Sequence, residues 1–269
     1  QIEADLKLVD AVCEIVDARI PASSRNPDID AICGDKPRMI VLNRMDLADP
    51  AATKKWAEYF RRKGMAVIAT DCKSKKGISA FTPAARLACA EKLERDAKRG
   101  MNRPLRVMVV GIPNVGKSTL INQISGRKSA KAENRPGVTR GKQWVTVDSG
   151  LQLLDTPGIL WPKFEDPEVG MMLAYTGAVK EGVIDLEELA YRLMELLHKF
   201  YPQTLLERYK VEAPEGTPGW QLLEMAARKR GYLVSGGEVN TERMAKVLLD
   251  EFRSGKLGNF TLEMPEDMV

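Results

Sequence analysis

The stretch Gly111-Ile112-Pro113-Asn114-Val115-Gly116-Lys117-Ser118 decides the fold of this 269-residue chain, because it matches the pattern G-x-x-x-x-G-K-[ST]. An apolar run, 107–110, precedes it, and a helix is predicted over 118–125. This order of strand, loop and helix separates a P-loop from a chance match. The glycines let backbone N–H groups face phosphate oxygens, Lys117 brings a charge to the β- and γ-phosphates, and Ser118 offers a hydroxyl to Mg²⁺. A turn that binds nothing is the alternative, and the Lys-Ser pair argues against it.

Composition narrows the class of protein. The length suggests about two domains, and 44% hydrophobic residues are enough for ordinary buried cores. No membrane-length apolar stretch and no leader pattern is found, so we expect a soluble, cytoplasmic protein with no membrane partner. The four cysteines contain no C-x-x-C pair, which argues against a zinc site or a disulfide framework. The net charge of +4 is modest, so nucleic-acid binding must be argued from local clusters of basic residues.

Hydrophobic periodicity predicts an α/β domain followed by a helical one. Strands are expected over 12–16, 39–42, 66–69, 107–110, 144–147 and 151–154, and helices over 50–63 and 83–99. Beyond these, helical spacing dominates, with helices expected from about 186 to 200, over 220–230 and over 241–252. We therefore predict a P-loop domain with a mainly parallel sheet over 1–177 and a small all-α domain over 178–269.

Polar residues follow several predicted strands, at the sheet edge where α/β proteins bind ligands. Asn43 and Asp46 form an N-x-x-D pattern after one strand, and the next ends in Thr70-Asp71-Cys72. A carboxylate can accept two hydrogen bonds from guanine, a pair that adenine does not offer, and a site built around it rejects the wrong base. Asp46 is therefore the predicted specificity residue. Arg44 stands where lysine is usual, and its planar guanidinium can still pack over a base.

The run Asp155-Thr156-Pro157-Gly158 follows another strand. Asp155 is placed to hold the shell of Mg²⁺, and Gly158 offers a backbone N–H to the γ-phosphate. Thr139, in the polar segment 126–142, is the candidate second hydroxyl on the ion, with an ordinary turn threonine as its alternative. The predicted catalytic residues are Lys117, Thr139 and Gly158, and the predicted Mg²⁺ ligands are Ser118, Thr139 and Asp155. The predicted nucleotide-binding residues are Asn43, Arg44, Asp46, Thr70, Asp71, Cys72, Asn114, Val115, Gly116, Lys117, Ser118, Thr119 and Gly158.

The N-x-x-D pattern precedes the P-loop, whereas in most GTPases it follows D-x-x-G, so the sheet must be circularly permuted. With P-G-V-T and D-T-P-G-I-L-W-P in this order, the chain resembles the circularly permuted GTPases, in particular the ribosome biogenesis GTPase A (RbgA/YlqF) family. Asp17-Ala-Arg-Ile-Pro-Ala-Ser-Ser-Arg-Asn-Pro27 and Arg253-Ser-Gly-Lys-Leu-Gly258 extend the resemblance over nearly the whole chain. It implies binding of GTP and GDP, GTP hydrolysis coupled to late maturation of the large ribosomal subunit, and a helical domain that contacts ribosomal RNA and protein. We expect a monomer.

Hydrolysis is expected to be slow without a partner. Ile159 stands where small signalling GTPases place a water-orienting glutamine, and the family's histidine that is proposed to help lies before the position of Gln1. His198, on the apolar-striped helix, is not expected to be catalytic. By analogy with unassisted GTPases, intrinsic turnover should be on the order of 10⁻³ s⁻¹ or below.

The sequence allows two interpretations each for Asn114, for the basic residues of the helical domain and for the overall function. Asn114 resembles a residue of GTPases that use K⁺, and it can equally satisfy the loop backbone. The basic residues of the helical domain can bind RNA phosphates, or they can form an ordinary solvated face. These residues are Arg228, Lys229, Arg230, Arg253 and Lys256. The alternative function is a nucleotide-switched scaffold whose slow hydrolysis is unimportant. A GTPase of membrane traffic is disfavoured, because no membrane segment or lipid motif is found.

Overall fold

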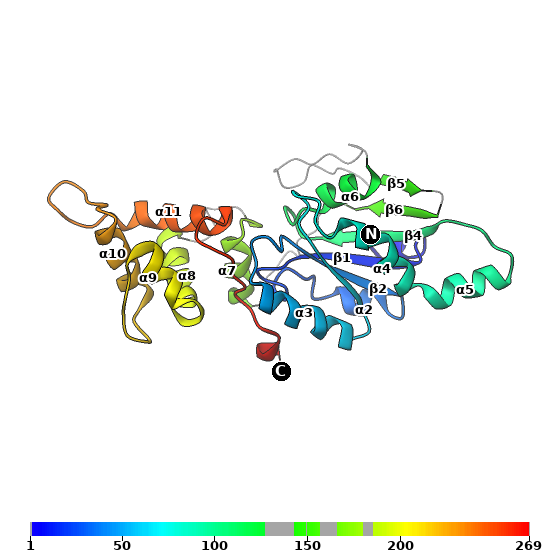
Figure 1. Cartoon of the computed structure of the whole chain (residues 1–269), viewed down its shortest axis with the longest axis horizontal. Helices are drawn as coiled ribbons and strands as arrows, with labels where there is room; N and C mark the ends of the chain where they lie inside the picture. The colour runs from blue at the N-terminus through cyan, green and yellow to red at the C-terminus, as the bar shows by residue number, and fades with distance from the viewer. Residues whose placement is uncertain (1, 127–142, 149, 157–165, 180–184, 269) are drawn as a thin grey trace. The chain divides into compact units, whose positions relative to one another are not determined.

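The computed structural model describes residues 2–126, 143–148, 150–156, 166–179 and 185–268 (Figure 1). The chain forms two compact units. The sheet unit comprises Gln1–Lys163 and Glu263–Val269, and the helical unit comprises Phe164–Leu262. The sequence predicts one boundary, after residue 177. In the structure the chain enters the helical unit earlier, and it returns to the sheet unit at Glu263.

A six-stranded sheet in the order β3-β2-β1-β4-β6-β5 forms the first unit. Its strands are β1 (Ala11–Asp17), β2 (Arg38–Asn43), β3 (Ala66–Thr70), β4 (Leu105–Gly111), β5 (Gln143–Asp148) and β6 (Leu151–Asp155). All neighbouring strands are parallel except β5 and β6, which form an antiparallel hairpin. The mainly parallel α/β sheet predicted from the sequence is therefore confirmed, and each predicted strand lies within an observed one.

Helices cover both faces of this sheet, which explains why its central strands are largely apolar. On one face, α1 (Ile2–Leu6), α2 (Ile29–Cys33) and α3 (Pro50–Arg62) bury two apolar clusters against β1, β2, β4 and β6. Two further helices, α4 (Phe81–Ala88) and α6 (Lys117–Ser125), pack against β2, β3, β4 and β6 on the other face. Asp49 caps α3 by accepting hydrogen bonds from the N–H groups of Ala51 and Ala52.

The helix expected over 83–99 is two helices in the structure. After the short 3₁₀ turn η1 (Ile78–Ala80), α4 ends at Ala88 and α5 (Ala90–Lys98) follows. Cys89 separates them with φ −108° and ψ 18°, outside the helical region. The side chain of Cys89 is buried, whereas α5 has no buried residue. The chain therefore turns where it leaves the core, a feature that helical periodicity alone does not reveal.

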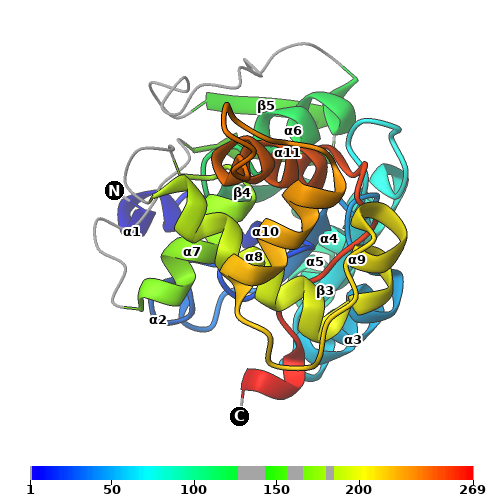
Figure 2. The ribbon, with the colours of Figure 1, turned by 90° about the vertical axis from the view of Figure 1, so that its left-hand side faces the viewer.

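The helical unit contains α7 (Pro167–Tyr175), α8 (Leu186–Phe200), α9 (Pro202–Tyr209), α10 (Gly219–Lys229) and α11 (Thr241–Ser254). Asp185 caps α8 by accepting from the N–H of Glu188, and α8 buries Leu189, Leu193 and Leu197 on its apolar side. Helices α10 and α11 pack against α8 (Figure 2). At Gly219 a Cβ atom would overlap the carbonyl of Tyr191, so only glycine lets the start of α10 lie this close to α8. Because α7 packs against α8 and α11, it belongs to this unit.

The segment after the helical unit joins the sheet unit again. Trp56 donates its indole N–H to the carbonyl of Glu263 at 2.9 Å, and Lys55 pairs with Glu266 at 2.9 Å. A short 3₁₀ turn, η2 (Pro265–Met268), follows. No helix among the described residues is both long enough and apolar enough to span a membrane.

Candidate active site

The P-loop connects the carboxyl end of β4 to the start of α6, as the sequence predicts. Asn114 and Gly116 take left-handed conformations, with φ values of 62° and 102°. A Cβ atom on Gly116 would overlap the side-chain nitrogen of Asn43, and one on Gly111 would overlap the side chain of Ile15. Glycine is therefore needed at both ends of the loop, because no side chain fits between the loop and the neighbouring strand ends.

Lys117 and Asp155 form a buried ion pair beside this loop. The ammonium group of Lys117 donates a hydrogen bond to the Asp155 carboxylate, and the two residues are 6% and 1% exposed. Asp155 reaches this position because β6 lies parallel to β4, with Asp155 opposite Val109. Thr156 holds the strand end in place by donating its hydroxyl to the Val109 carbonyl at 2.9 Å. The predicted phosphate-binding lysine and metal-holding carboxylate are thus brought together.

The donor set at this point suits Mg²⁺. Ser118, next to Lys117 at the start of α6, offers a hydroxyl, and Asp155 offers a carboxylate, both oxygen ligands of the kind that Mg²⁺ prefers. Among the described residues, no three His, Cys, Asp or Glu side chains come together as a metal site. The predicted residues Thr139, Gly158 and Ile159 lie outside the described residues.

Asn43, at the end of β2, fastens the predicted base-reading motif to the P-loop. Its side-chain N–H donates to the Val115 carbonyl at 2.7 Å. Its oxygen accepts from the Thr70 hydroxyl at 3.0 Å and from the Cys72 thiol at 3.1 Å. Burial raises the pKa of Cys72 to about 11, so the thiol stays protonated and can donate. The predicted residues Asn43, Thr70, Cys72 and Val115 therefore form one hydrogen-bonded group.

The neighbouring residue, Arg44, crosses to the P-loop. Its backbone is left-handed, with φ 59°, and its guanidinium donates to the Asn114 carbonyl at 2.7 Å. The side chain of Asp46 is exposed, so a base would have to bury this carboxylate when it binds. Asp71 accepts from the N–H of Lys73 at 2.8 Å and so closes the turn after β3, rather than joining the Asn43 group. Thr119 lies half-buried in the first turn of α6.

Asp17 is a part of the site that the predicted residue set leaves out. It ends β1, and its carboxylate accepts from Arg19 through the backbone N–H at 3.0 Å and through the guanidinium at 3.0 and 2.7 Å. It also lies 3.8 Å from Nε of Arg44. Burial alone would raise the pKa of Asp17, but Arg19 and Arg44 outweigh it and lower this pKa. The signal for Asp17 was its place at the end of a strand, at the same sheet edge as Asn43 and Asp155.

Comparison with known proteins agrees with this geometry. A family model described as 50S ribosome-binding GTPase matches residues 106–201. A protein of Priestia megaterium named ribosome biogenesis GTPase A is 44% identical, over 99% of this chain and 93% of its own length. This chain belongs to the ribosome biogenesis GTPase A family. It is a GTPase with the circularly permuted motif order that the sequence predicts.

Other members of the ribosome biogenesis GTPase A family support the assignment over the whole length. The protein of that name from Thermotoga maritima is 33% identical, over 100% of this chain and 91% of its own. A GDP-bound structure of YlqF matches with a TM-score of 0.71 at 29% identity, covering 99% of this chain and 100% of that one. A GNP-bound YlqF structure from T. maritima matches with a TM-score of 0.64, covering 99% and 97%.

The five predicted RNA-binding residues of this GTPase lie in different settings. Arg228 pairs with Glu224 one turn earlier on the exposed side of α10, and Lys229 is exposed. Arg230 instead lies over the ring of Tyr209, at 5.2 Å, and 3.7 Å from the carboxylate of Glu251.

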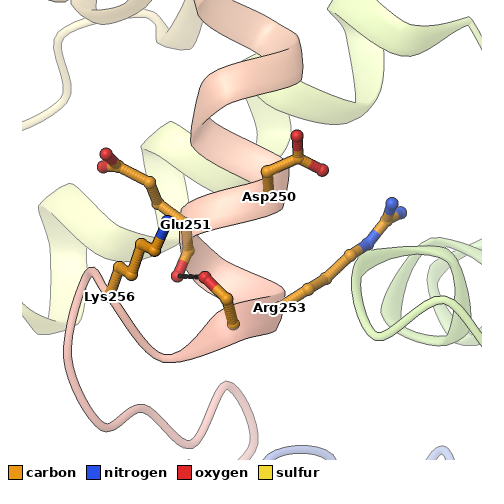
Figure 3. A pocket seen from close by; sticks show the side chains of 5 residues that line it. Asp250, Glu251, Arg253 and Lys256 are labelled. Carbon is orange, nitrogen blue, oxygen red and sulfur yellow. Dashed lines mark hydrogen bonds between the residues drawn. The ribbon is translucent and has the colours of Figure 1, made fainter.

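Arg253 and Lys256, the other two predicted RNA-binding residues, lie at the end of α11, and their side chains extend in opposite directions (Figure 3). They border an open hollow of about 410 Å³, lined by Asp250, Glu251, Arg253, Ser254 and Lys256. Arg253 donates to the carbonyls of Tyr175 and Ala174 at 3.0 and 2.8 Å, and so caps the end of α7. Lys256 is exposed. RNA binding stays a prediction for all five residues, with Arg228, Lys229 and Lys256 the most accessible.

His198 lies in the helical unit, where its Nε2 shares a hydrogen bond of 3.1 Å with the Ala213 carbonyl. This contact links α8 to the segment before α10 and gives the ring a structural role. The expectation that His198 is not catalytic stays a prediction.

Proposed function

We propose that this GTPase acts in the cytoplasm as an assembly factor in late maturation of the large ribosomal subunit. The observation that carries the proposal is the length of the match: 44% identity over 99% of the chain to a protein named ribosome biogenesis GTPase A. The match therefore includes the helical unit as well as the nucleotide site. The description of the matching family model, 50S ribosome-binding GTPase, supports the choice of subunit.

At the phosphate end, Lys117 exchanges the Asp155 carboxylate for the β- and γ-phosphates when GTP binds. Asp155 and Ser118 are then free to serve the magnesium shell, with Thr139 as the further hydroxyl and Gly158 as the donor to the γ-phosphate. Bound Mg²⁺ supplies positive charge to the phosphate oxygens as the bond to the γ-phosphate breaks. The buried ion pair of Lys117 and Asp155 supports this exchange, because one charge cannot leave the pair without a replacement partner.

At the base end, Asp46 accepts the two hydrogen bonds from guanine, and Arg44 packs its guanidinium over the ring. Asn43 lies beside them at the base end of the site. It holds the base-reading motif against the P-loop through Val115, which supports a fixed spacing between the base and phosphate ends. The fixed spacing favours a nucleotide of one length and shape.

In the helical unit, the accessible cations Arg228, Lys229 and Lys256 contact phosphates of structured ribosomal RNA. Their exposure supports this role, since phosphate contacts need side chains that are free to reach outward. We propose that Arg230 and Arg253 mainly shape the surface from which those cations extend.

The test is co-sedimentation of the protein with large ribosomal subunits in GTP, GDP and a non-hydrolysable GTP analogue. Binding in one nucleotide state, with release in another, is the expected result, and equal binding in all states would reject the switch. Multiple-turnover GTP hydrolysis should also accelerate when large subunits are added. Unchanged turnover would favour the slow scaffold instead. Repeating the assay in K⁺ and Na⁺ buffers tests whether Asn114 serves a potassium site.

A further inference from the structure

The loop of residues 18–25, between β1 and α2, lies next to the base-reading motif. The N–H of Ala18 donates to the carbonyl of Asn43 at 2.9 Å. The N–H of Asp17 donates to the hydroxyl of Ser24 at 2.9 Å, and Ser24 donates in turn to the Ile20 carbonyl at 2.7 Å. Most of the loop is buried. Because buried polar groups must keep their partners, these bonds fix the loop against the end of β2.

Asp17, the last residue of β1, links this loop to Arg44. Its carboxylate accepts hydrogen bonds from Arg19 of the loop and lies 3.8 Å from Nε of Arg44. Arg44 in turn reaches the P-loop by its bond to the Asn114 carbonyl. A shift of the loop therefore moves the carboxylate that lies beside the arginine. The backbone of Arg44 is in a strained left-handed conformation, which persists only when surrounding contacts hold it. The contacts of its side chain with Asp17 and Asn114 are among these.

On its other side, the loop is held by a residue about 240 positions away in sequence. The carboxylate of Glu263 accepts from the N–H of Ala22 at 2.8 Å, from the N–H of Ser23 at 3.1 Å and from the Ser23 hydroxyl. The backbone of Glu263 is itself fixed by Trp56, at 2.9 Å. Ser23 and Ser24 are adjacent, so one serine holds the returning chain while the next holds the strand end beside Asn43.

We propose that Glu263 is a positioning residue for the guanine nucleotide, acting through the 18–25 loop on Asn43 and Arg44. The proposal rests on the assignment of Asn43, Arg44 and Asp46 to the base end of the site. It adds a residue from the point where the chain leaves the helical unit. Movement of that exit would thus change nucleotide affinity without any contact between Glu263 and the nucleotide.

The test measures the dissociation constants of GDP and of a non-hydrolysable GTP analogue with the full chain. The variants are Glu263→Gln, which keeps the size of the side chain but removes its charge, and the milder Ser23→Ala. Both should weaken binding by about threefold to tenfold, within the usual range for couplings of this kind. The loss should be equal for the two nucleotides, since they share the base. Glu266→Gln is the matched control, because Glu266 is an exposed acid of the same segment that pairs with Lys55 on the surface.

A double variant tests whether Glu263 acts on the nucleotide through Arg44. It combines Glu263→Gln with Arg44→Ala. In the Arg44→Ala background, Glu263→Gln should have at most a small further effect, because the arginine that it positions is gone. An undiminished effect in that background, a loss confined to one nucleotide, or unchanged affinity of Ser23→Ala and Glu263→Gln would overturn the proposal. Lower thermal stability with unchanged affinity would also overturn it. The variant Asp46→Ala distinguishes a wrong role for Glu263 from a wrong assignment of the base end of the site. If Asp46→Ala also leaves nucleotide affinity unchanged, the assignment of Asp46 to the base is wrong.

Discussion

The ammonium group of Lys117 hydrogen-bonds the carboxylate of Asp155 inside the sheet unit, and both residues are nearly inaccessible to solvent. Removing one partner leaves the other charge buried and alone. We therefore expect Lys117→Ala to lower the free energy of unfolding of the nucleotide-free protein by about 3–5 kcal/mol. Urea denaturation measures this. The double variant Lys117→Met with Asp155→Leu should be more stable than Lys117→Ala, and equal instability of the two would show that the unpaired charge is not the cause.

Gly116→Ala should weaken nucleotide binding, because the added methyl group would overlap the side chain of Asn43. We expect the dissociation constant of GDP to rise about tenfold to a hundredfold, from the strain of a left-handed alanine together with this overlap. Fluorescent-GDP titration measures it. Gly126→Ala is the control, since Gly126 is also left-handed, with φ 63°, but its Cβ atom would have no neighbour within 4 Å. Equal loss in both variants would assign the effect to backbone strain alone.

Asp46→Asn should change which base is preferred. A carboxylate can accept from both N–H groups of guanine, whereas a side-chain amide can donate to the carbonyl that xanthine carries in place of the exocyclic amine. We expect GDP affinity to fall by at least about a hundredfold and xanthosine diphosphate to become the better ligand. Competition binding with the two nucleotides measures the ratio. An unchanged preference for GDP would mean that another residue reads the base.

Arg253→Ala should destabilise the helical unit, because the guanidinium caps two carbonyls at the end of α7. Charged hydrogen bonds of this type contribute about 1.5–3 kcal/mol. Urea denaturation of Arg253→Ala should show a loss of unfolding free energy of that size, whereas the exposed control Lys256→Ala should be nearly neutral.

In co-sedimentation with ribosomal subunits, Lys256→Ala should weaken binding and reduce the salt dependence of binding. If neither variant alters binding, the end of α11 is not a contact surface.

Glu251 should make the stability of the helical unit sensitive to acid. Hydrogen bonds from Arg208 lower the pKa of Glu251, burial opposes them, and Tyr209 adds a further bond. A carboxyl with a lowered pKa stabilises the fold above its ordinary pKa, and this stabilisation is lost as the pH falls through the lowered value. The stability difference between the native protein and Glu251→Gln should therefore be constant near neutral pH and shrink below about pH 4.5. A difference that does not depend on pH would contradict this.

Much of the site could be predicted because its chemistry depends on neighbours in sequence. Gly116, Lys117 and Ser118 lie in one turn, and Asn43 and Asp155 each end an apolar strand. Parallel strands bring their carboxyl ends to one sheet edge, so Lys117 meets Asp155 and Asn43 meets Val115. The same rule could have included Asp17, which ends β1. The role of the Asp17 carboxylate depends on Arg44, which comes beside it only in the fold, so the residues next to Asp17 in sequence do not indicate it.

Features set by long-range packing could not be predicted. The break at Cys89 depends on where the chain leaves the core, and periodicity continues through it. Arg253 looks like one of several exposed basic residues until its contact with the end of α7 is seen. Glu263 lies in a short segment without helical or strand pattern, so nothing local distinguishes it from Glu266. The unit boundaries depend on α7 and on Glu263, and they differ from the predicted boundary for these reasons.

The contact between Glu263 and the 18–25 loop also sets an order of events during synthesis. The N–H groups of Ala22 and Ser23 emerge early, but the carboxylate that satisfies them is translated about 240 residues later, after the whole helical unit. At usual translation speeds, the delay is roughly 10 to 50 seconds. During this time the sheet unit has a loop whose amides lack their final partner. The loop beside Asn43 therefore gains its full set of hydrogen bonds only after the helical unit has been made.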